Sequence, residues 1–79
     1  MKVHIRYYAK YVDYTGTKTE DIDVDRMTIA ELLELIKKKH PRLKEDKSSL
    51  VAVNSKFENE RKVISDGDTV SVFPPVSGG

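Results

Sequence analysis

The part of the sequence with the clearest potential for chemistry is its last stretch, "FPPVSGG", residues 73–79. Pro74 and Pro75 have no N–H to donate to a β-ladder and favour an extended course, so we expect the chain to leave a sheet here as an arm. Gly78 and Gly79 have no Cβ, so a narrow tunnel could admit their backbone. A carboxylate is a poor electrophile, but ATP can convert it to an acyl-adenylate, whose carbonyl accepts a sulfur or amine nucleophile. The tail is therefore predicted to be a handle that reacts at the carboxyl group of its last glycine.

A terminal Gly-Gly taken alone also fits a disordered chain end. Its position directly after a strand-like run and two prolines favours a projecting arm. We therefore divide the chain into a folded domain, residues 1–73, and a flexible C-terminal arm, residues 74–79.

The composition argues against several other classes of function. The 79 residues are enough for one domain, and this size argues against a deep enzyme cleft. The 14 Lys and Arg residues are mixed along the chain with 13 Asp and Glu residues, for a net charge of +1, which argues against nucleic-acid and membrane-surface functions. Cysteine is absent from the sequence, which excludes disulfides, thiolate metal sites and Cys nucleophiles. No apolar stretch suits a signal peptide or a membrane span, so we expect a cytoplasmic protein.

Alternating polarity predicts two strands in the first third of the chain. In "VHIRYYA" (3–9) the side chains alternate between an inward and an outward face, as in a half-buried strand. The segment "EDIDVD" (20–25) alternates in the same way, with Ile22 and Val24 inward and its three aspartates outward. A turn region around Gly16 joins the two, so they are expected to form a hairpin.

The segment "MTIAELLELIKKKHP" (27–41) predicts the main helix. Thr28 and Glu31 have the spacing of a capping box, which starts a helix. Pro41 disfavours helical geometry at His40 and ends it. One face carries an apolar stripe, made of Ile29, Leu32, Leu33 and Ile36.

The remaining strands are expected at "LVAVN" (50–54) and "TVSVF" (69–73), with a "DGD" turn before the latter and a short irregular strand within "ENERKVIS" (58–65). These elements predict an α+β fold. It is a β-grasp roll with one main helix packed on a mixed four- to five-stranded sheet. The first and last strands are expected to lie side by side and parallel in the centre of the sheet.

This arrangement predicts an aromatic surface. If Val70 and Val72 face the helix, Phe73 points to the opposite face of the sheet, which also carries Tyr8. Exposed aromatic side chains mark a partner surface, or they shield the sheet from water, and both interpretations remain open.

Four segments resemble a known family: "YYA" (7–9) with Gly16 after it, "VAVN" (51–54), "DGDTV" (66–70) and the tail "FPPVSGG". With these segments the sequence resembles the MoaD family of ubiquitin-like sulfur carriers, which form the small subunit of molybdopterin synthase. The resemblance spans nearly the whole chain. The charged segment "FENERKVI" (57–64) departs from the family pattern.

The resemblance implies a cycle in which this chain is not an enzyme by itself. An E1-like (MoeB-like) adenylyltransferase would adenylate the carboxyl group of Gly79 with ATP, and a sulfur donor protein would convert it to a thiocarboxylate. That group would donate sulfur to precursor Z in the large (MoaE-like) subunit, which holds the catalytic residues, during molybdenum cofactor biosynthesis. No cofactor is expected to bind this chain, and the activating enzyme consumes the ATP.

The resemblance also assigns roles to residues of the chain. Gly78 and Gly79 would form the reactive end. The residues expected to bind the partner are Tyr8, Phe57, Phe73, Pro74, Pro75, Val76 and Ser77.

A lysine amine could attack the same adenylate, which would make the chain a ubiquitin-like protein modifier similar to the small archaeal modifiers. Nothing in the tail separates these two fates, because both need the same adenylate; we favour the carrier. A third fate, sulfur carriage for thiamine or another pathway, is disfavoured by the diproline.

No metal site is predicted. The segment "DIDVDRMTIAEL" (21–32) begins like a calcium-binding loop, but Arg26 and Leu32 stand where that loop needs Gly and a bidentate Glu. Outward aspartates that repel edge-to-edge pairing explain the segment better. His4 and His40 lack ligand spacing and are expected at solvent or capping positions.

Overall fold

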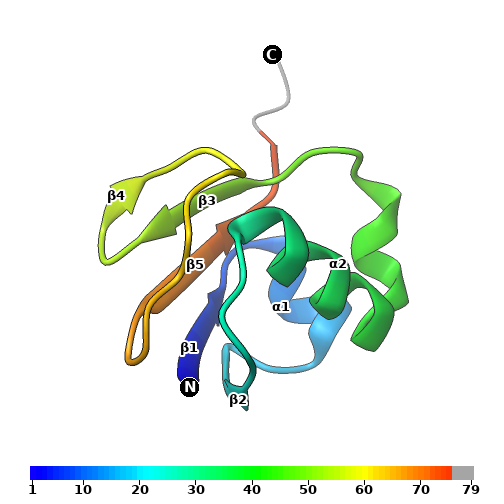
Figure 1. Cartoon of the computed structure of the whole chain (residues 1–79). Coiled ribbons are helices and arrows are strands. Elements are labelled where there is room, and N and C mark those ends of the chain that lie inside the picture. Colours follow the sequence, from blue (N-terminus) through cyan, green and yellow to red (C-terminus); the bar gives the residue numbers. More distant parts are fainter. Residues whose placement is uncertain (76–79) are drawn as a thin grey trace.

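The structure is a computed structural model that describes residues 1–75. Its strands are β1 (Lys2–Tyr7), β2 (Thr19–Asp23), β3 (Leu50–Val53), β4 (Lys56–Phe57) and β5 (Thr69–Phe73). Its helices are α1 (Lys10–Thr15), α2 (Ile29–Lys39) and the 3-10 helix η1 (Pro41–Glu45). The strands form a five-stranded sheet in the order β2-β1-β5-β3-β4, and the helices gather on one side of it (Figure 1).

The first and last strands run parallel in the centre of the sheet, which confirms the predicted β-grasp arrangement. Ile5 pairs with Val70, and Tyr7 pairs with Val72. The pairs β1–β2 and β3–β5 are antiparallel, and β4 lies at the outer edge beside β3. Because the central strands run in the same direction, their C-terminal ends lie at the same end of the sheet.

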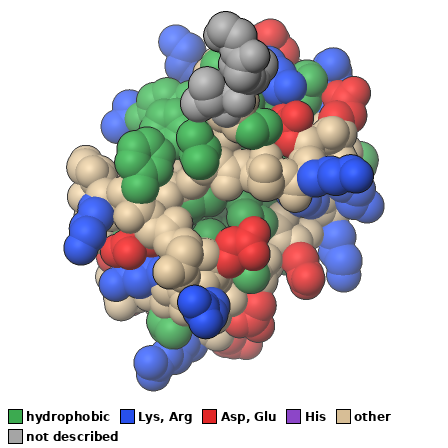
Figure 2. All heavy atoms as spheres, turned by 90° about the horizontal axis from the view of Figure 1, so that it is seen from above, with side chains coloured by type: hydrophobic (Ala, Val, Ile, Leu, Met, Phe, Trp, Pro, Cys, Tyr) green, Lys and Arg blue, Asp and Glu red, His purple; other side chains and the backbone are tan. Residues whose placement is uncertain are grey.

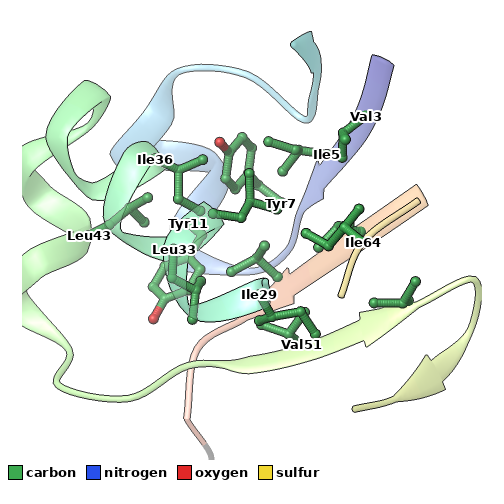
Figure 3. Close-up of a cluster of buried hydrophobic side chains, with 14 residues drawn as sticks. Val3, Ile5, Tyr7, Tyr11, Ile29, Leu33, Ile36, Leu43, Val51 and Ile64 are labelled. Carbon is green, nitrogen blue, oxygen red and sulfur yellow. The ribbon is translucent and has the colours of Figure 1, made fainter. Parts of the chain in front are cut away.

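Alternation along the strands builds the core as predicted. Val70 and Val72 are almost completely buried, and so are Val3 and Ile5 of β1. These side chains pack in one cluster with the apolar stripe of α2 (Figure 3). The same alternation directs the residues between them to the opposite face of the sheet.

The main helix begins and ends where the sequence predicts. The Thr28 hydroxyl accepts a hydrogen bond from the Glu31 N–H at 3.3 Å, and the Glu31 carboxylate accepts one from the Thr28 N–H at 3.0 Å. This is the expected capping box. His40 is the C-cap, and its N–H donates to the Ile36 carbonyl at 2.8 Å.

The first connection was predicted to be a turn region, but it contains the short helix α1. The first strand ends at Tyr7 rather than residue 9, because Ala9 has φ 54° and ψ −134°, which no strand residue adopts. Helix α1 follows, buries Tyr11, and ends at Gly16, which has the left-handed conformation that glycine adopts without strain.

The 3-10 helix η1 is also absent from the sequence-based prediction. It begins at Pro41, directly after α2, and buries Leu43. The connection after η1 holds α1 in place, because the Tyr11 hydroxyl lies 2.8 Å from Asp46 Oδ2 and 2.8 Å from Ser49 Oγ. Burial, together with the Asp46 carboxylate, raises the pKa of Tyr11 to about 12.

The prediction of a short strand within residues 58–65 is wrong. The short strand is β4, which precedes that segment and pairs with β3 through the two-residue turn Asn54–Ser55. Both turn residues have positive φ, 50° and 72°, as a tight hairpin turn requires. Within the expected segment, Val63 forms only an isolated bridge with Thr28.

A polar cluster joins the edge of the sheet to the C-terminal end of α2. Glu20 lies on the core side of β2, where its carboxylate accepts hydrogen bonds from the Tyr7 hydroxyl and from Lys39 Nζ. His40 Nε2 lies 2.8 Å from the same carboxylate. Burial alone would raise the pKa of Glu20, but the bonds from Lys39, Tyr7 and His40 outweigh it and lower the pKa to about 2. The charged carboxylate therefore stabilises the folded state.

We predict that Glu20→Gln lowers the free energy of unfolding by roughly 2–3 kcal/mol at pH 7, because a pKa lowered from 4.5 to about 2 corresponds to stabilisation of that order. This stabilisation is present in full above pH 4.5 and is lost as the pH falls towards about 2, where the folded protein also binds the proton. Urea denaturation at several pH values measures it.

Glu34→Gln is the matched control, because Glu34 is exposed on α2, and this variant should unfold like the wild-type chain. An equal loss of stability for Glu20→Gln at pH 7 and near pH 2 would contradict an origin in the carboxylate charge.

Candidate functional site

Three aromatic side chains lie together on the face of the sheet opposite the core. We call Tyr8, Phe57 and Phe73 the aromatic cluster. The rings of Tyr8 and Phe73 are stacked, with centroids 4.4 Å apart and planes 18° apart. The ring of Phe57 lies 5.8 Å from that of Phe73 at an angle of 49°. The structure thus brings together the three aromatic residues that were predicted to contact a partner.

Strand register explains how residues so distant in the chain meet. Ser71 of β5 pairs with Ala52 of β3, which in turn pairs with Phe57 of β4, so the three side chains share one face. One step along the sheet on the same face, Phe73 pairs with Leu50. Large side chains therefore surround two small ones, and Ser71 and Ala52 are 8% and 5% exposed.

The aromatic cluster shields the sheet only in part. Phe73 is half-buried, but Phe57 is 65% exposed and the neighbouring Leu50 is 41% exposed. Figure 2 looks onto this end of the molecule, where hydrophobic side chains gather and both basic and acidic side chains lie around them. An apolar patch of this kind on a small domain is typical of a protein–protein contact surface. The exposed ring of Phe57 favours the partner interpretation over simple shielding of the sheet.

The arm begins directly at the aromatic cluster. β5 ends at Phe73, as predicted, and Pro74 and Pro75 follow it outside any strand. The other predicted arm residues, Val76 and Ser77, and the predicted reactive glycines, Gly78 and Gly79, lie outside the described residues. Their roles therefore stay predictions.

Residues 1–75 contain no group of three or more His, Cys, Asp or Glu that could hold a metal ion. The aspartates of the discarded calcium loop are exposed, and Asp21 Oδ1 lies 2.7 Å from His4 Nδ1. Among the helices described, none has the length and apolar character needed to cross a membrane.

Sequence reasoning missed two members of the surface around the aromatic cluster. Leu50 extends the apolar patch, and alternation could have found it, because it precedes the buried Val51 in a strand. Arg6 places its guanidinium carbon 5.7 Å from the centroid of the Tyr8 ring, within the range of a cation–π contact. Residues two positions apart along an extended chain share a face, so the sequence could have predicted this contact between Arg6 and Tyr8.

Comparison with known proteins gives a consistent result. The sequence profile of the ThiS family matches residues 5–79. The molybdopterin synthase sulfur carrier subunit of Homo sapiens is 31% identical over 83 residues, an alignment that covers 99% of this chain and 94% of that protein.

Solved structures with the same fold include a putative molybdopterin converting factor, subunit 1, from Pyrococcus furiosus. Its TM-score is 0.86 at 31% identity, over 96% of this chain and 99% of that one. SAMP1 from Haloferax volcanii has a TM-score of 0.85 at 25% identity, over the full length of both chains. A chain from the complex of subunits 1 and 2 of the molybdopterin-converting factor of Helicobacter pylori has a TM-score of 0.68 at 27% identity, also over the full length of both.

The family profile covers nearly the whole chain, and a relative of more than 30% identity matches it from end to end. The resemblance to sulfur-carrier subunits found in the sequence is therefore confirmed, and the chain belongs to the ThiS family.

Proposed function

We propose that this chain is the sulfur-carrier small subunit of a molybdopterin synthase. The observation that carries the proposal is the aromatic cluster at the root of the arm, an exposed contact surface directly beside the segment that would deliver the reactive end. The family membership and the names of the relatives support the same function.

The chemistry would take place at Gly79 in three steps. A carboxylate oxygen attacks the α-phosphate of ATP, and pyrophosphate leaves to give an acyl-adenylate. A hydrosulfide ion supplied by a sulfur donor protein then attacks the acyl carbon, the bond to AMP breaks, and AMP leaves to give a thiocarboxylate. The thiocarboxylate finally transfers its sulfur to precursor Z, and water restores the carboxylate. The first step belongs to an E1-like activating enzyme and the last to the large subunit, so both catalytic sites lie on partners.

The described residues would contribute recognition and delivery. Phe57 and Leu50 offer apolar surface that a partner can remove from water, and such burial drives most protein association. Phe73 is held by its stack on Tyr8, so the arm starts from a fixed point on the rigid sheet. A fixed starting point lowers the entropy lost when the arm enters a partner.

A second candidate function is a ubiquitin-like modifier, in which a lysine amine of a target protein attacks the adenylate of Gly79. The similarity to SAMP1, over the full length of both chains, favours keeping this candidate. The two functions share the activation step and differ only in the nucleophile.

We predict that incubation with an E1-like adenylyltransferase, ATP and a sulfur donor raises the intact mass by the exchange of one oxygen atom for sulfur. A chain without Gly79 should show no such gain, and a reaction without ATP is the matched control. Mass spectrometry of the purified chain measures the exchange. A blot of native cells for this chain, run in parallel, tests for conjugates.

If the mass does not rise and native cells show a ladder of conjugates that depends on Gly79, the sulfur-carrier function is wrong and the protein-modifier function is favoured. Absence of both the mass gain and the ladder would contradict both functions.

We also predict that Phe57→Ala and Phe73→Ala each weaken binding to the large synthase subunit by about tenfold or more, because exposed aromatic anchors dominate contact surfaces. Titration calorimetry measures the affinity. Leu35→Ala is the matched control, because Leu35 is 39% exposed on α2, away from the aromatic cluster.

Phe57→Ala should change the free energy of unfolding by less than about 1 kcal/mol, since the side chain is largely exposed. If both aromatic variants bind with the affinity of the wild-type chain, the proposed docking role of the aromatic cluster is contradicted.

A further inference from the structure

A small groove opens beside the aromatic cluster, where β1 ends, α1 begins and β2 starts. It encloses about 320 Å³, and its walls include Arg6, Tyr8, Val12, Lys18 and Thr19. The walls are mainly apolar, whereas the two cationic side chains are exposed. The groove thus combines an apolar interior with a positively charged mouth, and we call it the basic groove.

The backbone fixes the shape of the basic groove. Ala9 has φ 54° and ψ −134°, so the chain turns sharply away from the sheet after Tyr8 and leaves a hollow before α1. The Tyr7 N–H donates to the Lys18 carbonyl at 2.8 Å, which ties the start of β2 to the end of β1. Arg6 lies on β1 and Lys18 directly precedes β2, so this backbone hydrogen bond keeps the two residues on adjacent, bonded segments.

The two cations have no carboxylate partner among residues 1–75, where no Asp or Glu oxygen lies within 4.0 Å of the charged nitrogens of Arg6 or Lys18. The two acidic residues of β2 nearest to the groove in sequence are engaged elsewhere. Asp21 pairs with His4, and Glu20 points to the core, where it binds Lys39 and His40. The positive charge at the groove is thus available to an external anion.

The basic groove is continuous with the contact surface described above. Tyr8 belongs to both, because one side of the groove is formed by this residue and its ring stacks on Phe73. A protein that covers the aromatic cluster therefore reaches the mouth of the groove without a gap. Continuity with the docking surface and the positive charge together indicate what kind of group fills it.

We propose that the basic groove receives an acidic segment of the large synthase subunit, with one apolar side chain inside the groove and carboxylates facing Arg6 and Lys18. This inference rests on the proposed function, because it takes the large subunit as the partner that covers the aromatic cluster. Complementary charge of this kind speeds encounter and fixes orientation. The groove would thus set the orientation of the docked chain, and with it the direction in which the arm leaves.

The test uses Arg6→Glu/Lys18→Glu in the full chain, with binding to the large subunit measured by surface plasmon resonance at low and at high salt. We expect the affinity at low salt to fall by about tenfold or more, mainly through slower association, because rim charges act on the encounter rate. The wild-type affinity should fall as salt rises, and that of the variant should fall less.

Lys38→Glu/Lys44→Glu is the matched control, since these exposed cations lie on α2 and η1, and it should bind like the wild-type chain. Circular dichroism and thermal unfolding of both variants check that the fold is kept. The milder Arg6→Gln/Lys18→Gln, which should weaken binding less, replaces the first variant if that one does not fold.

If Arg6→Glu/Lys18→Glu binds with wild-type affinity while Phe73→Ala binds weakly, the proposed role of the basic groove is wrong and the proposed function still holds. Wild-type affinity in both would overturn the docking surface as a whole.

A further measurement separates the other possible occupants of the groove. Methyl signals of Val12 in the free chain should not move when residues 76–79 are deleted or when inorganic phosphate is added. A shift on deletion would place the chain's own carboxyl end in the groove, and a shift with phosphate would indicate a small-anion site. Either result would overturn the proposal.

Discussion

The parallel pairing of β1 with β5 is the constraint on which the rest of the structure depends. It joins the two ends of the sequence in the centre of the sheet, with Tyr7 opposite Val72. Parallel neighbours finish at the same end of a sheet, so the residue after β1 meets the last residue of β5. This pairing alone brings Tyr8 onto Phe73 and sets Pro74, where the arm begins, directly after the aromatic cluster. An antiparallel pair would have placed the arm and Tyr8 at opposite ends.

Much of this fold could be predicted from the sequence because its main signals are local and repeated. Apolar and polar residues alternate along the β-strands. Helix α2 has both a capping box and a stripe of apolar residues, and Pro41 marks its end. The helices α1 and η1 could not be found in this way. Six residues are too few for a stable isolated helix, so α1 depends on tertiary contacts. Its anchor is the bond from Tyr11 to Asp46, thirty-five positions away, which no local pattern carries.

The candidate site also has parts that local sequence signals predict and parts that they do not. Tyr8 and Phe73 followed from alternation, because each lies next to a residue that must face the core. The partner role of Phe57 was predicted only from the family resemblance, because the short strand was expected later in the chain. The position of Phe57 depends on the hairpin turn made by the positive φ angles of Asn54 and Ser55. The basic groove had no signal in the sequence, because it arises from one unusual backbone conformation at Ala9.

The geometry of the sheet also keeps stability and recognition on separate residues. In β5, Val72 is buried in the core while Phe73 belongs to the aromatic cluster. Tyr7, the last residue of β1, and Tyr8 directly after it divide in the same way. Neighbours along a strand point to opposite faces, so a change to the contact surface leaves the core packing intact. A chain of this size can therefore alter its partner surface by single substitutions without losing its fold. The same strands that hold the core then act as a rigid base for both the docking surface and the arm.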